Sequence, residues 1–382
     1  MASVSATLSS GRTGLHRSAH QRQPTAARGL FQVQRVCKRA VRASAASSTG
    51  VEAVEGVDAS FTPLIQAGLD KCLTETHLPI HGEHYVGKVR DTYDLGDSLL
   101  IVTTDRQSAF DRLLAHVPFK GQILNQTSAW WMRQTRNIVP NALLSLPDPN
   151  AVLMRKCRVF PVEFVVRGFL TGSTDTSLWT HYSAGSRDYC GNALPDGLRK
   201  NARLEANIIT PTTKSAEHDE PISPEDIVRR GLMTQAEWDA ASAAALALFA
   251  FGQAEAARRG LLLVDTKYEF GVDAEGTIRL VDEIHTPDSS RYWLADSYAR
   301  RHAAGQEPEN VDKEFLRLWF RANCDPYRDA VLPAAPAELV TELSRRYILL
   351  YETITGEPFQ PPALDEPLHE RLRRNLAAAG IC

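Results

Sequence analysis

Residues 264–272, VDTKYEFGV, alternate between charged side chains and side chains that are apolar, aromatic or hydroxylated. A period of two is the pattern of a β-strand whose two faces differ. Asp265, Lys267 and Glu269 share one of these faces. Exposure to solvent is the ordinary explanation for charges on a strand, and the neighbouring strand decides whether it holds here.

The following residues predict a hairpin that brings a fourth charge to the same face. A turn at 273–276 with a loop of two or four residues would pair Lys267 with Asp282, whereas a three-residue loop would shift the register. In the favoured register Glu269 and Asp282 are diagonal neighbours, and two carboxylates this close repel unless a cation lies between them. Oxygen ligands with no His or Cys nearby suit magnesium better than zinc, so both are predicted metal ligands.

Elsewhere the periodicity places strands mainly early in the chain and helices mainly late. Extended structure is predicted over 84–106, interrupted by a turn, and over 151–170, where Pro161 implies an edge or a bend. Helices are predicted at 121–135, after Ser223-Pro224, from the capping box Thr234–Glu237 to Arg259, and near 312–323 and 337–352. The predicted fold class is α+β.

Composition describes an ordinary enzyme-sized chain with an unusual beginning. Of 382 residues, 43% are hydrophobic and 23% are charged, and the longest apolar run, 240–251, is Ala-rich and too short to span a bilayer. The first fifty residues contain eight basic residues, eight serines and no acidic residue. This composition predicts a transit peptide over 1–48, with plastids favoured over mitochondria, rather than a merely basic disordered tail.

Charge and cysteine spacing exclude some partners and sites. The net charge is −3, so removal of the eight basic residues leaves an acidic body, on which we expect no nucleic-acid surface. We expect no membrane partner either, and the oligomeric state stays open. The six cysteines show no C-x-x-C spacing and are expected to be reduced thiols.

Several polar stretches contain candidate anion-binding residues. Lys88 and Arg90 follow a glycine and fall on one strand face, where a ligand or only solvent would meet them. Arg167 ends an apolar strand before the hydroxyl-rich turn 171–173, which suits an anion site or a structural arginine. The turn 286–291 offers hydroxyls and a guanidinium, the groups that bind phosphate.

Two common kinds of site are not supported. The chain contains no G-x-x-x-x-G-K-[ST], so it has no P-loop. The loop 210–223 contains Lys214 and His218, but no second His lies at ligand spacing. We therefore predict a substrate loop or a structural turn there, not a metal site.

Six motifs stand in a characteristic order: GKVRD, TDRQSAFD, VVRGFLTGS, TPTTKSAEHDE, DTKYEFG and VDEIHTPDSSRYW. In this respect the chain resembles the SAICAR synthetases over about 87–293, with further similarity through DKEFLRLWF. The resemblance implies an ATP-dependent ligase of purine biosynthesis that joins L-aspartate to the carboxylate of carboxyaminoimidazole ribonucleotide (CAIR), with ATP and Mg²⁺ as cofactors. It also implies two lobes, a β-rich, kinase-like nucleotide lobe over 49–160 and a larger α+β lobe over 161–382 with C-terminal helices. Residues 1–48 lie outside the family core, which suggests an organellar form of plant or algal type.

Matched position by position, the resemblance also implies residue roles. The expected catalytic residues are Lys267 and Asp265, and the expected metal ligands are Glu269 and Asp282. The expected ATP-binding residues are Lys88, Arg90, Met154, Val159 and Glu163. The expected ribonucleotide-binding residues are Arg167, Ser173, Asp288, Ser289 and Arg291. The expected residues on the aspartate side are Arg106, Ser108 and Asp111, and Lys214 is expected in a substrate loop.

Two other functions fit the same charged strands. A small-molecule kinase would transfer phosphate to a hydroxyl and would need no amine acceptor. A catalytically inactive nucleotide-binding regulator would not need Lys267, Glu269 and Asp282, all of which are present.

Overall fold

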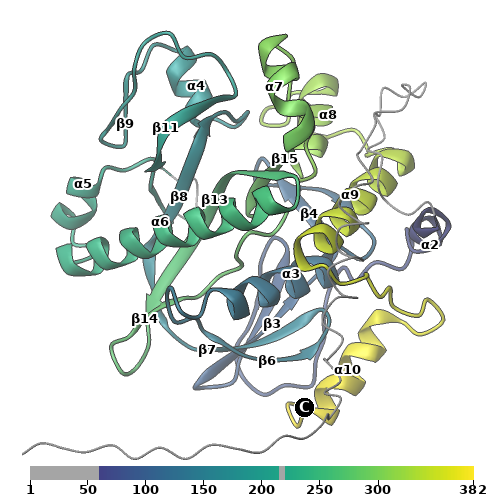
Figure 1. The fold of residues 1–382 in the computed structure, drawn as a ribbon. Helices are drawn as coiled ribbons and strands as arrows, with labels where there is room; N and C mark the ends of the chain where they lie inside the picture. Colours follow the sequence, from purple (N-terminus) through teal and green to yellow (C-terminus); the bar gives the residue numbers. More distant parts are fainter. Residues whose placement is uncertain (1–59, 215–219) are drawn as a thin grey trace, which may run out of the picture. The chain divides into compact units, whose positions relative to one another are not determined.

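The computed structural model describes residues 60–214 and 220–382. The predicted leader over 1–48 and His218 lie outside the described residues. Two main sheets and two short hairpins contain the strands (Figure 1). The first sheet has the order β1-β2-β3-β7-β6, and the second has the order β11-β8-β13-β14, with β12 paired to β8 and β15 paired to β13. Strands come from both halves of the chain and are interleaved with helices, so the predicted α+β class is confirmed.

The bounds of the elements are as follows. The strands of the first sheet are β1 His84–Val86, β2 Arg90–Asp94, β3 Ser98–Thr103, β7 Ala151–Arg155 and β6 Leu143–Asp148. The strands of the second sheet are β8 Arg158–Leu170, β11 Ala202–Ile209, β12 Thr212–Thr213, β13 Leu261–Val272, β14 Ile278–Leu280 and β15 Ser290–Leu294. The short hairpins are β4 Arg106–Ala109 with β5 Arg112–His116, and β9 Asp188–Tyr189 with β10 Asn192–Ala193. The helices are α2 Phe61–Ala67, α3 Lys120–Gln134, α4 Leu178–Ser183, α5 Pro224–Arg229, α6 Gln235–Arg258, α7 Ala295–Ala303, α8 Glu314–Asn323, α9 Ala337–Thr355 and α10 Leu368–Ala378.

The hairpin of β13 and β14 forms, but in a different register from the one predicted. Phe270 pairs with Leu280 and Val272 pairs with Ile278, so the loop is one residue longer than a four-residue loop. The predicted pairing of Lys267 with Asp282 is therefore wrong as a ladder pair. β14 ends at Leu280, and the last link is the Val281 N–H donating to the Glu269 carbonyl oxygen.

The long strand β8 contains Pro161 in its interior, although it pairs with neighbours on both sides. Its pairing with β13 shifts by two residues between the Glu163–Glu269 pair and the Val159–Gly271 pair, so a bulge falls at the proline. Proline lacks the N–H that a regular ladder requires, and a bulge accommodates this loss. The predicted bend is thus confirmed.

Helix α6 crosses the second sheet (Figure 1). It begins with the predicted capping box, in which Thr234 and Glu237 satisfy each other's backbone N–H groups. Among the described residues it is the one helix that is long and apolar enough to cross a membrane by length and composition. Its buried residues, which include Trp238, Leu248 and Phe249, join the apolar core against β8 and β13, so packing accounts for its apolar character.

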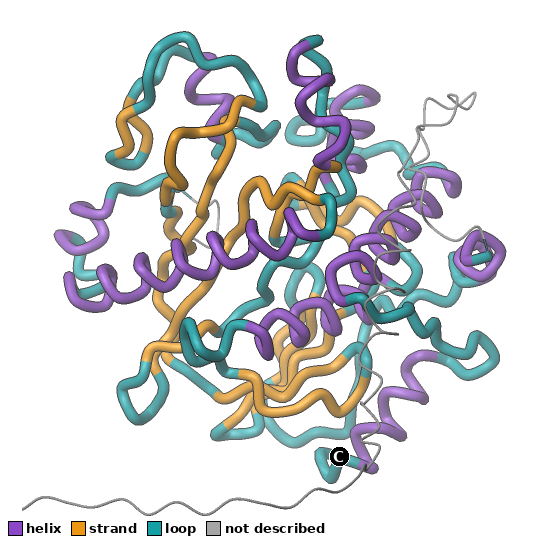
Figure 2. The backbone as a smooth tube through the Cα atoms, viewed as in Figure 1, coloured by secondary structure: helices purple, strands orange, loops and turns teal. Residues whose placement is uncertain are grey.

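Helices α3 and α9 lie beside each other next to the β4–β5 hairpin (Figure 2). Leu343, Tyr347 and Ile348 of α9 share one core with Ile123 and Leu124 of α3. The Ser344 hydroxyl donates to the Pro118 carbonyl oxygen at 2.8 Å, which ties α9 to the segment before α3. This packing brings a helix from the end of the chain to the loop that precedes β15. The five cysteines in the described residues are free thiols, as predicted.

Candidate active site

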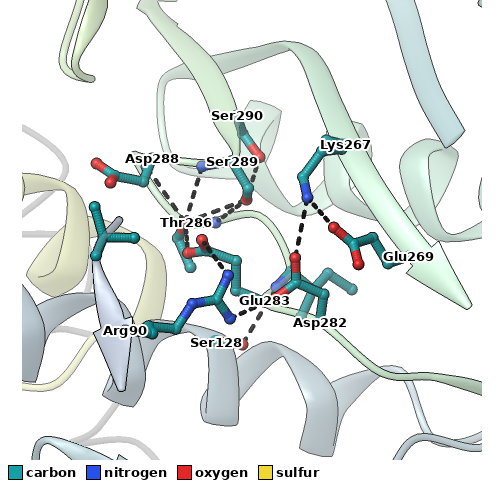
Figure 3. Close-up of polar contacts among 12 residues, drawn as sticks. Arg90, Ser128, Lys267, Glu269, Asp282, Glu283, Thr286, Asp288, Ser289 and Ser290 are labelled. Atoms are coloured by element: carbon teal, nitrogen blue, oxygen red, sulfur yellow. Dashed lines mark hydrogen bonds and ion pairs between the residues drawn. The ribbon is translucent and has the colours of Figure 1, made fainter. Parts of the chain in front are cut away.

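Asp265 and Glu269 on the charged face of β13 are buried, Lys267 between them is half-buried, and carboxylates surround its amine; Figure 3 shows two of them, Glu269 and Asp282. The Lys267 amine lies 3.2 Å from a Glu163 oxygen of β8 and 3.1 Å from an Asp282 oxygen of the segment after β14. It also donates to Glu269, two residues along β13. The predicted cluster therefore exists, although the register that predicted it is wrong. Glu163 joins it from the strand beside β13, so its side chain lies in the carboxylate ring.

Burial and charge act in opposite directions on this cluster. Burial alone would lower the pKa of Lys267, but Glu269, Asp282 and Glu163 raise that pKa well above its usual value. Burial would raise the pKa of Asp282, but Arg90 and Lys267 hold it well below its usual range. Lys267 and Asp282 are therefore both ionised at neutral pH. Lys267 is a fixed cation and cannot accept a proton as a general base.

Arg90 links the first sheet to this cluster. Its guanidinium donates to Asp282 and, at 3.3 Å, to Glu283. Together with Met154 and Asp282 it lines a small cavity of about 30 Å³ between the first sheet and α3. Met154 thus lies in the same cavity as Arg90, and its contact with a nucleotide stays a prediction. Val159 does not line this cavity, and its side chain on β8 is 41% exposed.

The segment between β1 and β2 corrects the prediction for Lys88. Residues 87–89 form a bend rather than strand, so Lys88 does not share a strand face with Arg90. The exposed Lys88 amine instead pairs with Asp111, at the turn between β4 and β5. Ser108 is half-buried on β4. The proposed contacts of Ser108 and Asp111 with aspartate stay predictions.

Arg106 lies behind the same bend and holds it in place. Its guanidinium donates to the carbonyl oxygens of Thr74, Gly87 and Lys88, and to the Asp91 carboxylate at 2.6 Å. These bonds occupy four of the five N–H donors of the buried guanidinium. The geometry therefore gives Arg106 the role of anchoring the 87–88 bend, and contact with aspartate stays a prediction.

A second charged cluster surrounds Asp265 at the other end of the charged face. The Asp265 carboxylate accepts a hydrogen bond from Arg291 at 2.6 Å and lies 3.8 Å from the Arg167 guanidinium. Arg291 also donates to Glu314 at 3.3 Å, and Ser173 donates to the same carboxylate. The structure thus brings Arg167, Ser173 and Arg291 together, as the sequence predicts for a ribonucleotide site.

Asp288 and Ser289 belong to a tight loop between β14 and β15. The Thr286 hydroxyl accepts from the backbone N–H groups of Asp288 at 3.3 Å and Ser289 at 3.1 Å. The Ser289 carbonyl oxygen accepts from the Lys267 N–H at 3.0 Å, so the loop is bonded directly to the centre of β13. The Asp288 carboxylate points away from Lys267 (Figure 3).

Comparisons with known proteins now identify the family. The family model for SAICAR synthetase matches residues 83–333. A protein of Arabidopsis thaliana named phosphoribosylaminoimidazole-succinocarboxamide synthase, chloroplastic, is 63% identical over 319 residues, which cover 82% of this chain and 78% of that protein. A synthase of the same name, without the chloroplastic label, from Legionella pneumophila (strain Lens) is 63% identical over 305 residues, which cover 80% of this chain and 97% of that protein. The chain belongs to the SAICAR synthetase family.

A solved structure agrees with this family assignment. The SAICAR synthase from Saccharomyces cerevisiae, in complex with SAICAR, superposes with a TM-score of 0.65 at 31% sequence identity. The match covers 75% of this chain and 99% of the yeast chain. The resemblance found in the six sequence motifs is therefore confirmed for both family and fold.

For a SAICAR synthetase, the donor set at Lys267 fits a magnesium ion that arrives with a nucleotide. Within residues 60–214 and 220–382, no group of three or more His, Cys, Asp or Glu side chains is arranged to hold a metal. Glu269 and Asp282 nevertheless converge on one amine, so their oxygens already share a cation. Magnesium commonly takes one or two carboxylates and completes its shell with water and phosphate oxygens. The two carboxylates therefore fit a metal–nucleotide complex rather than an all-protein cage.

The start of α8 supplies charged residues that the sequence-based prediction missed. Burial lowers the pKa of Lys313 to about 8, with Asp288 opposing that shift. Arg317 lies 3.2 Å from Glu314, and its Nε has no hydrogen-bond partner in the described part of the chain. Burial would raise the pKa of Glu314, but Arg291 and Arg317 hold it at about 2. In the sequence these charges fall within the six-residue stretch DKEFLR. This clustering of charge is the sequence feature from which they could have been found.

Lys214 also lies at the site. Its amine pairs with Glu269 and its side chain is partly exposed. The residues after it, 215–219, are outside the described part of the chain. Lys214, the last described residue before them, thus joins the carboxylate ring, and its role in a substrate loop stays a prediction.

Proposed function

We propose that this chain is a SAICAR synthetase of plastids, which uses ATP to join L-aspartate to the carboxylate of CAIR. The observation that carries the proposal is the arrangement on β13. A lysine ringed by three carboxylates lies two residues from an aspartate that two arginines contact. The first cluster suits a metal-bound triphosphate, and the second suits a phosphorylated substrate. Family membership supplies the identity of the reactants.

The reaction needs two steps at one carboxyl group, phosphorylation of its oxygen and then amide formation at its carbon. A carboxylate is a poor acyl donor, so one of its oxygens attacks the γ-phosphorus of ATP and ADP leaves. The aspartate amine then attacks the carbonyl carbon of the acyl phosphate, loses a proton and expels inorganic phosphate. Phosphoryl transfer depends chiefly on positioning and charge neutralisation. Lys267 is suited to this task because its carboxylate neighbours keep it charged.

The nucleotide side of the site follows from the first cluster. Glu269 and Asp282 would hold magnesium, which when bound neutralises and orients the phosphate oxygens. The Arg90 guanidinium bonds to the carboxylates of Asp282 and Glu283. When a nucleotide binds, phosphate oxygens can replace these carboxylates as its acceptors. Met154 forms an apolar part of the cavity wall, which suits an adenine ring. Because the cavity holds about 30 Å³, side chains along its wall must move to admit a base.

The ribonucleotide side follows from the second cluster. The Nε atoms of Arg291 and Arg317 have no hydrogen-bond partner among the described residues, so each guanidinium keeps an unused donor. Arg167, which lies 3.8 Å from Asp265, and Lys313 add further positive charge. A phosphate group would satisfy these donors, and guanidinium forks match its geometry. We therefore place the non-reacting 5′-phosphate of CAIR at this cluster.

The lobe boundary and the subcellular location of the protein are part of the same proposal. A nucleotide lobe over 49–160 and a substrate lobe over 161–382 would place the two main sheets in different lobes, except for the first three residues of β8, which lie before the boundary. Residues 1–48 would direct the protein into plastids. The chloroplastic label of the Arabidopsis thaliana relative supports this location.

One incubation tests the proposed function against its alternatives. The full chain is mixed with ATP, MgCl₂ and CAIR, with and without L-aspartate, and products are identified by mass spectrometry. We expect an amide that contains aspartate, together with ADP and phosphate, only when aspartate is present. A phosphorylated ribonucleotide formed equally well without aspartate would identify a kinase. Binding of ATP with no product would identify an inactive regulator.

A further inference from the structure

The Asp288 carboxylate is buried and points away from Lys267 (Figure 3). The Tyr347 hydroxyl of α9 donates to its Oδ1 at 2.6 Å, and the Gln107 amide of β4 lies 3.4 Å from the same oxygen. The amine of Lys120, the first residue of α3, lies 3.1 Å from Oδ2. Three elements distant in sequence therefore meet at one carboxylate.

The burial of these groups requires an explanation beyond packing. The Lys120 side chain is 0% exposed, and a buried ammonium is costly unless a counter-ion lies beside it. Buried ion pairs are weak evidence for added stability, because apolar residues of similar volume stabilise a fold as well or better. A phenylalanine would fill the space of the Tyr347 ring without a hydroxyl. A requirement for one defined position of Asp288 accounts for both polar groups.

The backbone connects that position to the proposed substrate site. The residue after Asp288 accepts the Lys267 N–H, and Ser290 donates its N–H to Thr286 at 3.0 Å. Arg291, three residues after Asp288, contacts Asp265. A shift of the Asp288 side chain would therefore move both the loop beside Lys267 and the guanidinium proposed to bind phosphate.

We infer that Tyr347 and Lys120 are positioning residues that hold Asp288, and through it the loop 286–289 and Arg291, in the geometry that binds the ribonucleotide. This inference rests on the proposed function. α9 lies beyond residues 83–333, which the family model matches. A C-terminal helix outside that match thus completes the substrate site from behind.

The test compares two tyrosines of the same helix. Tyr347→Phe removes only the hydroxyl that reaches Asp288. Tyr351→Phe is the matched control, because its hydroxyl lies one turn further along α9 and contacts Glu357 instead, at 3.3 Å. We expect Tyr347→Phe to raise the dissociation constant and KM of CAIR about tenfold, equivalent to roughly 1.4 kcal/mol. The KM values of ATP and aspartate should change by less than about twofold, and Tyr351→Phe should leave all three unchanged.

A double-variant cycle tests whether Tyr347 acts through Asp288. If it does, adding Tyr347→Phe to Asp288→Ala should cost little further CAIR affinity, because the hydroxyl no longer has an oxygen to hold. Additive effects would overturn the inference. So would a Tyr347→Phe protein that binds CAIR like the wild type, or one in which all three substrates weaken together. Calorimetric titration of CAIR distinguishes failure of this inference from failure of the proposed function. If wild-type protein binds CAIR but forms no amide, only the proposed function is refuted.

Discussion

Arg291→Lys should weaken ribonucleotide binding far more than the retained charge suggests. The Arg291 guanidinium donates to Asp265 at 2.6 Å and to Glu314 at 3.3 Å, and its Nε stays unpaired among the described residues. One planar fork thus connects two buried carboxylates and still keeps a donor. A lysine amine is a single point charge that cannot span both carboxylates and also reach a phosphate.

The magnitude follows from the hydrogen bonds that a lysine at this position cannot make. If the lysine keeps its pair with Asp265, one charge-assisted hydrogen bond to the phosphate disappears, at a cost of about 1.5–3 kcal/mol. This corresponds to a rise of roughly ten- to 150-fold in the dissociation constant of CAIR. Glu314 keeps Arg317 as a partner at 3.2 Å, so the fold should survive.

Calorimetric titration of CAIR, ATP and aspartate against the variant provides the assay. Arg158→Lys is the control, because it makes the same substitution in the same sheet at an exposed pair with Glu237. We expect CAIR affinity alone to fall, and only in Arg291→Lys. If ATP binding collapsed while CAIR bound normally, Arg291 would belong to the nucleotide site and the placement of the 5′-phosphate would be wrong.

Three further predictions address the metal, the pH dependence and the leader. Glu269→Gln should abolish most turnover while circular dichroism stays unchanged, because the carboxylate serves the metal–nucleotide complex; normal activity with normal magnesium dependence would refute this role. Burial lowers the pKa of His285 to about 3, below its value in the unfolded chain. The contribution of neutral His285 to the free energy of unfolding is therefore complete above about pH 6.5 and declines toward pH 3. The loss between pH 7 and pH 5 should be about 2 kcal/mol. In urea unfolding, the free energy of unfolding of His285→Gln should therefore change less with pH than that of the wild type, and equal slopes would contradict this explanation. A chain that begins near Ser47 should keep full activity, and residues 1–48 should carry a reporter into plastids; a cytosolic reporter would exclude a transit peptide.

The most sharply predicted helix starts are those with local signals. α6 has its capping box, and α5 has Pro224 at its first position. α3, α8 and α9 have no side-chain cap, and only their hydrophobic pattern predicts them. α7 follows Leu294 and α10 follows Pro367, also with no side-chain cap, and neither is predicted. Their first turns look like any polar segment in the sequence. These helices form because the rest of the chain offers a surface for them, and such tertiary packing has no short-range signature.

The same distinction separates the predicted from the missed residues of the site. Lys267, Glu269 and Asp265 share a strand face, which the period of two reveals. The partners of Asp288 are 59 residues away at Tyr347 and 181 residues away at Gln107. Their contacts depend on how α9 and β4 pack, and no periodicity along the chain encodes that.

Asp282 shows why an incorrect register still predicted the correct neighbours. It lies beyond the end of β14, so pairing does not place it. The reversal after it is fixed instead by His285, a buried residue with a left-handed φ of 53°. Tyr268 bonds to the His285 ring, and the Tyr292 hydroxyl donates to its carbonyl oxygen at 2.8 Å.

Helix α6 closes this arrangement from the other side of the sheet. A Cβ atom at Gly252 would overlap the His285 ring and come within 2.7 Å of Leu263, so only glycine fits beneath the reversal. Left-handed backbone at a residue other than glycine costs about 1–3 kcal/mol and persists where its surroundings impose it. Here β13, β15 and α6 impose it together, and the result is that Asp282 reaches Lys267 while the loop 286–289 turns back toward β13. The charged face on β13 is therefore completed by a strained turn, which a strand-pairing argument cannot predict even when it names the correct carboxylate.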